Sequence, residues 1–153
     1  MSRNIVESFT AKEGRYMNLY EVMELWNALG KVKDKKMPVK ISFAISRNIS
    51  LLSPEVRDIQ RHRTDIIQKY IERDPDGNPV VDTDGGAKIT DPEGLEKDLD
   101  ALLSEHSDIA VRTVSESVFE ACDADRYDAF TPGEISALSA MIEYTHVQKA
   151  EEK

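Results

Sequence analysis

The feature that most constrains this fold is a stripe of apolar residues that runs through residues 41–70 at helical spacing. The stripe consists of Ile41, Ile45, Ile49, Leu52, Val56, Ile59, Ile66 and Tyr70, with Arg63 at the one step that is not apolar. Steps of three and four residues place side chains on one face of a helix. The sequence therefore predicts a long amphipathic helix over residues 39–72 that pairs with another helix.

The tripeptide Ser53-Pro54-Glu55 interrupts this helix. A proline inside a helix removes one main-chain hydrogen bond and clashes with the preceding turn. Ser53 is also a suitable cap for a new helix that begins at Pro54. Two alternatives follow: one kinked helix, or two nearly collinear helices.

Capping motifs predict three further helices. The motifs are Asn18 with Glu21, Asp91 with Pro92, and Thr131-Pro132-Gly133-Glu134. They begin helices over residues 19–29, from 92 to near 104, and from 132 onward. The last helix is expected to turn Ile135, Leu138 and Ile142 inward, and residues 109–114 alternate as a strand does.

The segment between the two helical parts is open to two interpretations. Residues 82–93 have the length of an EF-hand loop, and Asp82, Asp84 and Glu93 stand at three of its ligand positions. Gly86 and Ala87 do not fit, because the first removes a side-chain ligand and the second stands where the loop needs glycine. These mismatches argue against a calcium-binding module, and the three acidic residues are weak metal candidates.

A β-hairpin accounts for more of the same segment. Val80-Val81 and Lys88-Ile89 are short β-prone runs, and Asp84-Gly85 between them is a strong turn signal. Asp76-Gly77 marks an earlier turn, out of the preceding helix. We therefore expect a hairpin here, without a cofactor.

Together these elements predict a single α+β domain that is mainly α. It contains a helical hairpin with one long, kinked or divided helix, a small β-hairpin or sheet, and a C-terminal helix. The expected parts are residues 1–17 (irregular or a short strand), 18–73 (helical), 74–91 (β-hairpin), 92–145 (helix, strand and helix) and 146–153 (a frayed tail). No internal repeat is evident.

Composition narrows the class of function. No apolar run approaches the roughly 20 residues of a membrane span, and the N-terminus lacks an apolar signal region, so a cytoplasmic location is expected. Residues 1–73 hold 14 Lys and Arg against 9 Asp and Glu, whereas residues 74–153 hold 6 against 20. This acidic second half argues against direct nucleic-acid binding.

Nothing in the sequence has the pattern of a catalytic site. Cys122 is the one cysteine, and acidic neighbours oppose its activation. His62, His106 and His146 lie far apart in the sequence, which argues against a shared metal site. We expect no catalytic residues and no enzymatic activity.

The order of the motifs resembles a family of small phage and prophage proteins of unknown function, often encoded among virion or tail-region genes. The likeness covers residues 18–143 and is carried by Leu19-Tyr20-Glu21, Leu25-Trp26-Asn27-Ala28-Leu29, Met37-Pro38-Val39-Lys40, Asp76-Gly77-Asn78-Pro79-Val80, Asp91-Pro92 and Thr131-Pro132-Gly133-Glu134-Ile135. The chain departs from the family pattern at Ser53-Pro54 and at Cys122–Asp128. The resemblance implies a phage origin and a role in the bacterial host cytoplasm, and it supplies no catalytic residues.

The expected function is therefore a non-enzymatic one, through protein–protein interaction in virion or tail assembly, with a phage or host protein or a second copy as partner. The residues predicted to bind it are Val56, Ile59, Arg63, Ile66, Tyr70, Asp98, Asp100 and Glu105. An alternative is an inhibitor of a host defence or nucleic-acid enzyme, whose acidic half would stand in for phosphates.

Overall fold

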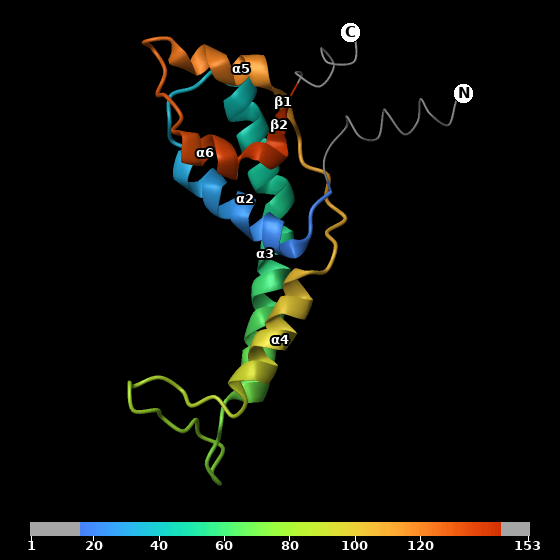
Figure 1. The fold of residues 1–153 in the computed structure, drawn as a ribbon, viewed down its shortest axis with the longest axis vertical. Helices are drawn as coiled ribbons and strands as arrows, with labels where there is room; N and C mark the ends of the chain where they lie inside the picture. Colours follow the sequence, from blue (N-terminus) through green and yellow to red (C-terminus); the bar gives the residue numbers. More distant parts are fainter. Residues whose placement is uncertain (1–15, 145–153) are drawn as a thin grey trace, which may run out of the picture.

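The molecule consists of a head, a stalk and a tip (Figure 1). It is seen here in a computed structural model that describes residues 16–144. The head holds α2 (Leu19–Val32), residues 39–59 of α3 (Val39–Tyr70) and residues 105–144. The stalk pairs residues 60–70 of α3 with α4 (Pro92–Leu103), and the tip is residues 71–90. The predictions for residues 1–15 and 145–153 lie outside the described residues.

α2 begins at the predicted capping box. The Asn18 side chain accepts from the Glu21 backbone N–H at 2.8 Å, and the Glu21 carboxylate accepts from the Asn18 N–H at 3.0 Å. These two bonds satisfy donors that a helix N-terminus leaves free. The helix does not stop at Gly30 as predicted, because Val32 is buried and continues its apolar face.

α3 is a single helix of 32 residues. It continues through Pro54, so the division into two helices is wrong. Pro54 is exposed, whereas Leu52 and Val56 on either side are buried. The apolar face is thus continuous across the proline, and packing along it holds the helix together.

The core of the head forms where α2 lies against α3 and both are covered by the C-terminal half of the chain. Its largest fully buried side chains include Leu25, Leu29, Ile41, Leu52, Leu138, Met141 and Ile142. One polar side chain, Asn48, is buried among them at 0% exposure. Its amide donates to the Arg112 carbonyl at 3.1 Å and accepts from the Arg112 N–H at 2.8 Å, which ties an extended segment to α3.

The strand predicted over residues 109–114 is displaced toward the C-terminus. Strand β1 (Val114–Ser115) pairs in parallel with β2 (Ile142–Glu143), with Val114 opposite Ile142. Residues 108–113 are extended without a strand partner. Between the strands lie α5 (Glu116–Glu120), the 3-10 turn η1 (Ala121–Asp123), α6 (Pro132–Ala137) and the 3-10 turn η2 (Ser139–Met141).

The C-terminal helix is shorter than predicted. α6 starts at the expected capping box of Thr131 and Glu134, but it ends at Ala137. Leu138 is buried as predicted, whereas Ile142 reaches the core from a strand. The sheet pairing with Val114 has replaced the last helical turn.

The tip contains the predicted hairpin and a second turn of the same design. In the first turn the Gly77 N–H donates to the Asp74 carbonyl at 2.9 Å, and in the second the Gly85 N–H donates to the Asp82 carbonyl at 3.0 Å. Both glycines have positive φ, at 88° and 92°. The turns lie eight residues apart, so the chain contains a short repeat that the sequence analysis missed.

Three extended residues join the two turns in a closed ring of main-chain hydrogen bonds. The Glu72 N–H donates to the Lys88 carbonyl, the Lys88 N–H to the Val80 carbonyl, and the Val80 N–H to the Glu72 carbonyl, each at 2.8 Å. The three segments that contain Glu72, Val80 and Lys88 therefore each contact the other two. They do so through single antiparallel bridges and not through one continuous ladder.

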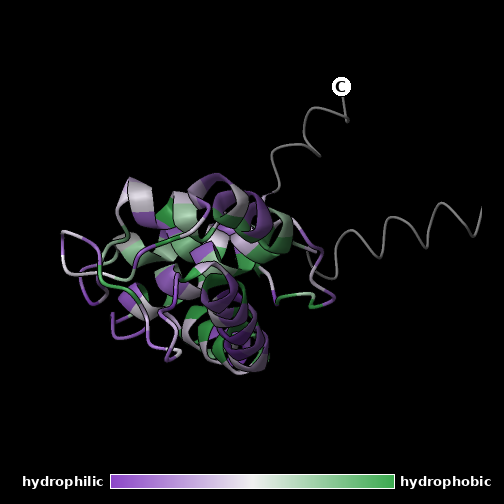
Figure 2. Ribbon diagram, turned by 90° about the horizontal axis from the view of Figure 1, so that it is seen from below, coloured by the Kyte–Doolittle hydropathy of each residue, from purple (hydrophilic) through white to green (hydrophobic). Residues whose placement is uncertain are grey.

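The fold is α+β and mainly α, as predicted. Viewed along the stalk, the helices alternate hydrophobic and hydrophilic faces, as amphipathic helices do (Figure 2). Within residues 16–144, no helix combines the length and the apolar character that a membrane crossing requires.

Candidate functional site

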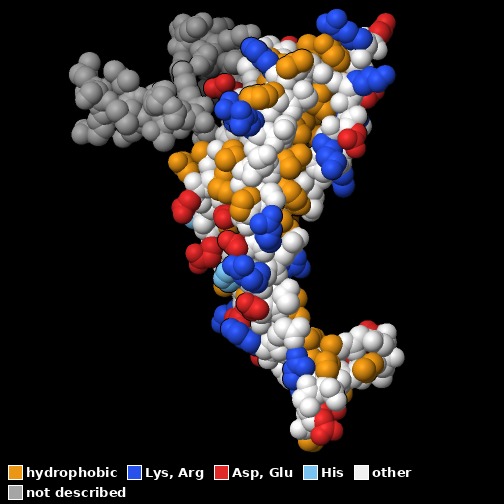
Figure 3. Space-filling model, turned by 180° about the vertical axis from the view of Figure 1, so that it is seen from behind, with side chains coloured by type: hydrophobic (Ala, Val, Ile, Leu, Met, Phe, Trp, Pro, Cys, Tyr) orange, Lys and Arg blue, Asp and Glu red, His pale blue; other side chains and the backbone are white. Residues whose placement is uncertain are grey.

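The most prominent surface feature is an apolar groove of about 630 Å³ between α4 and the tip. Its apolar lining comes from Ile89, Pro92, Leu95, Leu99 and Leu103. Charged side chains stand at its margins: Asp82, Lys88, Glu96 and Asp100. Hydrophobic side chains gather where the lower stalk meets the tip (Figure 3). We call this surface the stalk groove.

The stalk groove exists because α4 has more apolar surface than α3 can cover. None of the twelve residues of α4 is buried. Leu102 and Leu103, near its C-terminus, reach the core of the head, whereas Leu95 and Leu99 are half-buried and lie beyond it. A helix of this length is marginal alone in water and depends on packing. Its apolar face is thus incompletely covered.

Tyr70 and Asp98 join the two helices of the stalk. The Tyr70 hydroxyl donates to the Asp98 carboxylate at 2.6 Å. This hydrogen bond, together with desolvation and the negative charges of Asp98 and Asp91, raises the pKa of Tyr70. Gly94 permits the close approach, since a Cβ at that position would lie 3.1 Å from the Tyr70 ring.

The two stalk helices carry opposite charge. Residues 57–70 of α3 contain four Arg and Lys against two Asp, and residues 91–103 contain five Asp and Glu against one Lys. The ion pairs within residues 16–144 are Arg61–Asp58, Lys88–Glu72 and Lys35–Glu134. None of these joins α3 to α4, so the opposite charges are not used to hold the stalk together.

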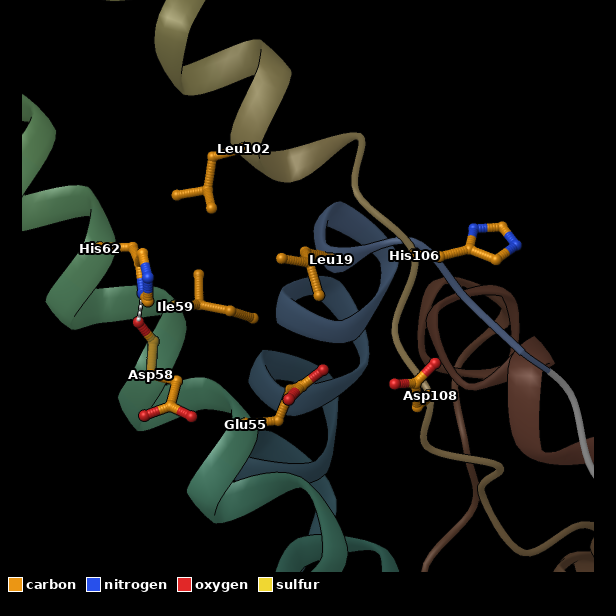
Figure 4. Close-up of a pocket in the computed structure, with 8 residues that line it drawn as sticks. All are labelled: Leu19, Glu55, Asp58, Ile59, His62, Leu102, His106 and Asp108. Atoms are coloured by element: carbon orange, nitrogen blue, oxygen red, sulfur yellow. Dashed lines mark hydrogen bonds between the residues drawn. The ribbon is translucent and has the colours of Figure 1, made fainter.

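A second cleft, of about 300 Å³, lies at the base of the stalk (Figure 4). Leu19, Ile59 and Leu102 point toward one another from α2, α3 and α4, and the His106 ring turns away from them. His62 Nδ1 lies 2.9 Å from the Asp58 carbonyl oxygen. In the part of the chain that the structure describes, no three His, Cys, Asp or Glu side chains are grouped to hold a metal ion.

The weak metal candidates make local hydrogen bonds instead. Asp82 Oδ1 accepts from the Thr83 N–H at 2.7 Å, and Asp84 Oδ1 accepts from the Gly86 N–H at 3.2 Å. Glu93 stands in the first turn of α4, where a negative charge favours the helix N-terminus. These carboxylates therefore shape the turns and the helix start.

Two of the predicted partner-binding residues are wrong. Val56 and Ile59 are 3% and 2% exposed, because α2 and the segments that follow α4 cover this part of α3. They belong to the core of the head and offer no surface to a partner.

The other predicted residues are accessible but do not form one surface. On α3, Arg63 is exposed and Ile66 is half-buried. Asp100 is exposed at the margin of the stalk groove, and Glu105 is exposed beyond the end of α4. Tyr70 and Asp98 hydrogen-bond each other within the stalk.

Sequence reasoning missed the three central residues of the groove, Ile89, Leu95 and Leu99. The spacing of Leu95, Leu99 and Leu102 is typical of an apolar helix face, but spacing alone does not show that part of the face is left uncovered. The relative lengths of the helices could have predicted the groove. The apolar stripe on α3 is more than two turns longer than α2, so α2 cannot cover all of it.

Comparison of the chain with models of protein families, with curated proteins and with solved structures gave no match. The resemblance to phage proteins therefore stays a prediction.

Proposed function

We propose that this is a non-enzymatic phage protein that acts by protein–protein interaction in the host cytoplasm, in virion or tail assembly. The observation that carries the proposal is the stalk groove. Leu95 and Leu99 stay half-buried in it, and an apolar groove with a charged margin is suited to bind the apolar surface of a partner. The stalk projects it away from the head, where a partner can reach it from several directions.

The polar groups of the base cleft support a non-catalytic role. His62 is oriented by a main-chain carbonyl and not by a carboxylate, which is the usual partner of a catalytic base. Outside this cleft, the thiol of Cys122 in the head is buried at 2% exposure, and burial disfavours the reactive thiolate.

The acidic residues of the second half give less support to the inhibitor alternative. Asp98 is bonded to Tyr70, Asp100 borders the apolar groove, and Glu105 is exposed beyond the end of α4. A mimic of nucleic acid presents a regular row of free carboxylates, whereas these three residues have different surroundings.

Site-specific photocrosslinking tests the proposal. A photoreactive amino acid replaces Leu99 in the groove or, as the matched control, Val39, which is 79% exposed on the head. The full chain is produced in bacteria together with phage virion genes. We expect a protein adduct from the Leu99 position and none from Val39. Adducts from Val39 alone, or from neither position, would refute a binding role for the stalk.

A further inference from the structure

We infer that the occupant of the stalk groove is the stalk of a second copy of this chain, so that the two stalks form a four-helix bundle with a two-fold axis. This inference rests on the proposed function, because it names the partner of the same surface. It is argued from the incomplete packing of the stalk, from its charges and from its symmetry.

A pair of helices leaves much of its apolar surface exposed. Two helices bury only the strip along which they touch, whereas a four-helix bundle encloses apolar positions on two sides of every helix. Leu95 and Leu99 of α4 and Ile66 and Ile67 of α3 are all half-buried, and none of them reaches the core of the head. Leu95 and Leu99 line the groove, whereas Ile66 and Ile67 lie outside its lining. A second pair of helices that covers both α3 and α4 would complete the burial.

The charges of the stalk favour a second copy of the chain as the source of this second pair of helices. A partner for the whole stalk needs acidic charge where α3 is basic and basic charge where α4 is acidic. This chain has both helices side by side, and its own ion pairs do not join them within residues 16–144. A second stalk therefore supplies the complementary charges without any other protein.

Two-fold symmetry determines how the two stalks face each other. A two-fold axis makes the same surface meet itself, so a residue on α4 of one copy contacts α3 of the other, and the reverse contact follows automatically. Arg63 and Lys69 are exposed on α3, and Glu96 and Asp100 are exposed on α4 at the groove margin. Placing α4 over the partner's α3 brings these opposite charges to the rim of a leucine-rich interface, where complementarity fixes partner and register.

An exchange of charges tests this arrangement with the full chain. The first variant carries Arg63→Glu and Lys69→Glu, so that both of its stalk helices are acidic. The second variant carries Glu96→Lys and Asp100→Lys, so that residues 91–103 hold three Lys against three Asp and Glu and the groove margin of α4 is basic at both exchanged positions. Each variant alone is expected to have the mass of one 17.3 kDa chain by native mass spectrometry. An equimolar mixture is expected to form a species that contains one chain of each kind.

The mixture is decisive because all four changed positions are exposed, and circular dichroism verifies that each variant keeps its helices. If the mixture stays monomeric while the unchanged protein is dimeric, the pairing of α4 with the partner's α3 is overturned. If the unchanged protein stays monomeric up to about 1 mM, which bounds association at roughly −4 kcal/mol, the inference is overturned as a whole.

The crosslinking experiment separates failure of this inference from failure of the proposed function. An adduct of Leu99 with a second copy of the chain supports both. An adduct with a different protein overturns the second-copy inference and leaves the binding role standing. Absence of any adduct from Leu99 overturns both.

Discussion

The Tyr70 hydroxyl, at the last residue of α3, donates a hydrogen bond of 2.6 Å to the Asp98 carboxylate in the middle of α4. This contact is the polar link between two helices whose remaining contacts in the stalk are apolar and half-exposed. It also lies beside Gly94, where an added Cβ would come within 3.1 Å of the Tyr70 ring and closer still to the Asp91 carboxylate. The geometry of the stalk, and so of the groove, depends on this pair.

Removing the hydroxyl with Tyr70→Phe is expected to loosen the lower stalk while the head stays intact. Amide hydrogen exchange checks this, with faster exchange expected in residues 66–70 and 94–98 and unchanged exchange in α2. Asp98→Asn is the matched control, because its side-chain oxygen still accepts the hydrogen bond. Loosening by Asp98→Asn without loosening by Tyr70→Phe would show that the charge of Asp98, and not the hydrogen bond, sets the geometry.

The same pair predicts a loss of stability in alkali. The hydrogen bond to Asp98 raises the pKa of Tyr70 in the folded chain above the ordinary value near 10. The folded chain thus holds the phenolic proton more tightly than the unfolded chain. The contribution of the Tyr70–Asp98 hydrogen bond to the free energy of unfolding is complete below the pKa of tyrosine in the unfolded chain. It is lost as the pH rises through the pKa of Tyr70 in the folded chain. The pKa of Tyr20 is also raised, by its hydrogen bond to Glu24, so absorbance titration of the tyrosinates should show late-titrating groups that Tyr70→Phe reduces by one.

Asn48 is expected to be among the least replaceable residues of the head. Asn48→Ala leaves the Arg112 N–H and C=O without their partner beside a buried site. Because each unsatisfied buried group costs about 1–3 kcal/mol, the loss of both partners should lower the free energy of unfolding by roughly 2–6 kcal/mol. Chemical denaturation measures this. Asn27→Ala, at an exposed position of α2, is the matched control and should change little.

Pro54→Ala is expected to stabilise the protein. The site already has helical geometry, is exposed, and lacks the N–H that would bond the Ser50 carbonyl. Restoring that donor removes part of a penalty of about 3 kcal/mol for proline in a helix. A gain of about 1–3 kcal/mol in denaturant unfolding is predicted. Ser46→Ala on the same helix is the control, and an unchanged or lower stability of Pro54→Ala would contradict this account.

In the tip, Gly86 is expected to tolerate replacement by alanine, whereas Gly77 and Gly85 are not. Gly77 and Gly85 have positive φ, so alanine at either should cost about 1–2 kcal/mol locally. Gly86 has no such φ, and a Cβ there would lie 3.7 Å from Asp84 Oδ1, an ordinary contact. Hydrogen exchange at Glu72, Val80 and Lys88 should therefore rise for Gly77→Ala and Gly85→Ala and stay unchanged for Gly86→Ala.

Local chemistry made several elements predictable from the sequence. The side-chain oxygens of Asn18, Asp91 and Thr131 accept from backbone donors three residues on, so the helix starts could be placed. Asp84-Gly85 located a turn because a positive φ suits glycine. The apolar spacing on α3 indicated a long helix even across Pro54.

Other features depend on contacts that are distant in the sequence. The pairing of Val114 with Ile142 joins two-residue strands, which are too short to leave a pattern. The ring of Glu72, Val80 and Lys88 uses main-chain atoms alone, so its side chains do not reveal it. The stalk groove depends on where α2 ends relative to α3 and α4. The periodicity of apolar residues shows that a helix face is apolar, but it does not show which other element covers that face.

The central claim is that the stalk groove binds a second stalk, and sedimentation equilibrium of the full chain tests it most directly. The apparent mass should rise with concentration from that of one 17.3 kDa chain toward twice that value. Leu99→Asp should hold it at one chain, because the charge would be buried in the apolar interface, whereas Val39→Asp on the head should behave as the unchanged protein does. A mass of one chain at every concentration, or a dimer that Leu99→Asp leaves intact, would contradict the claim.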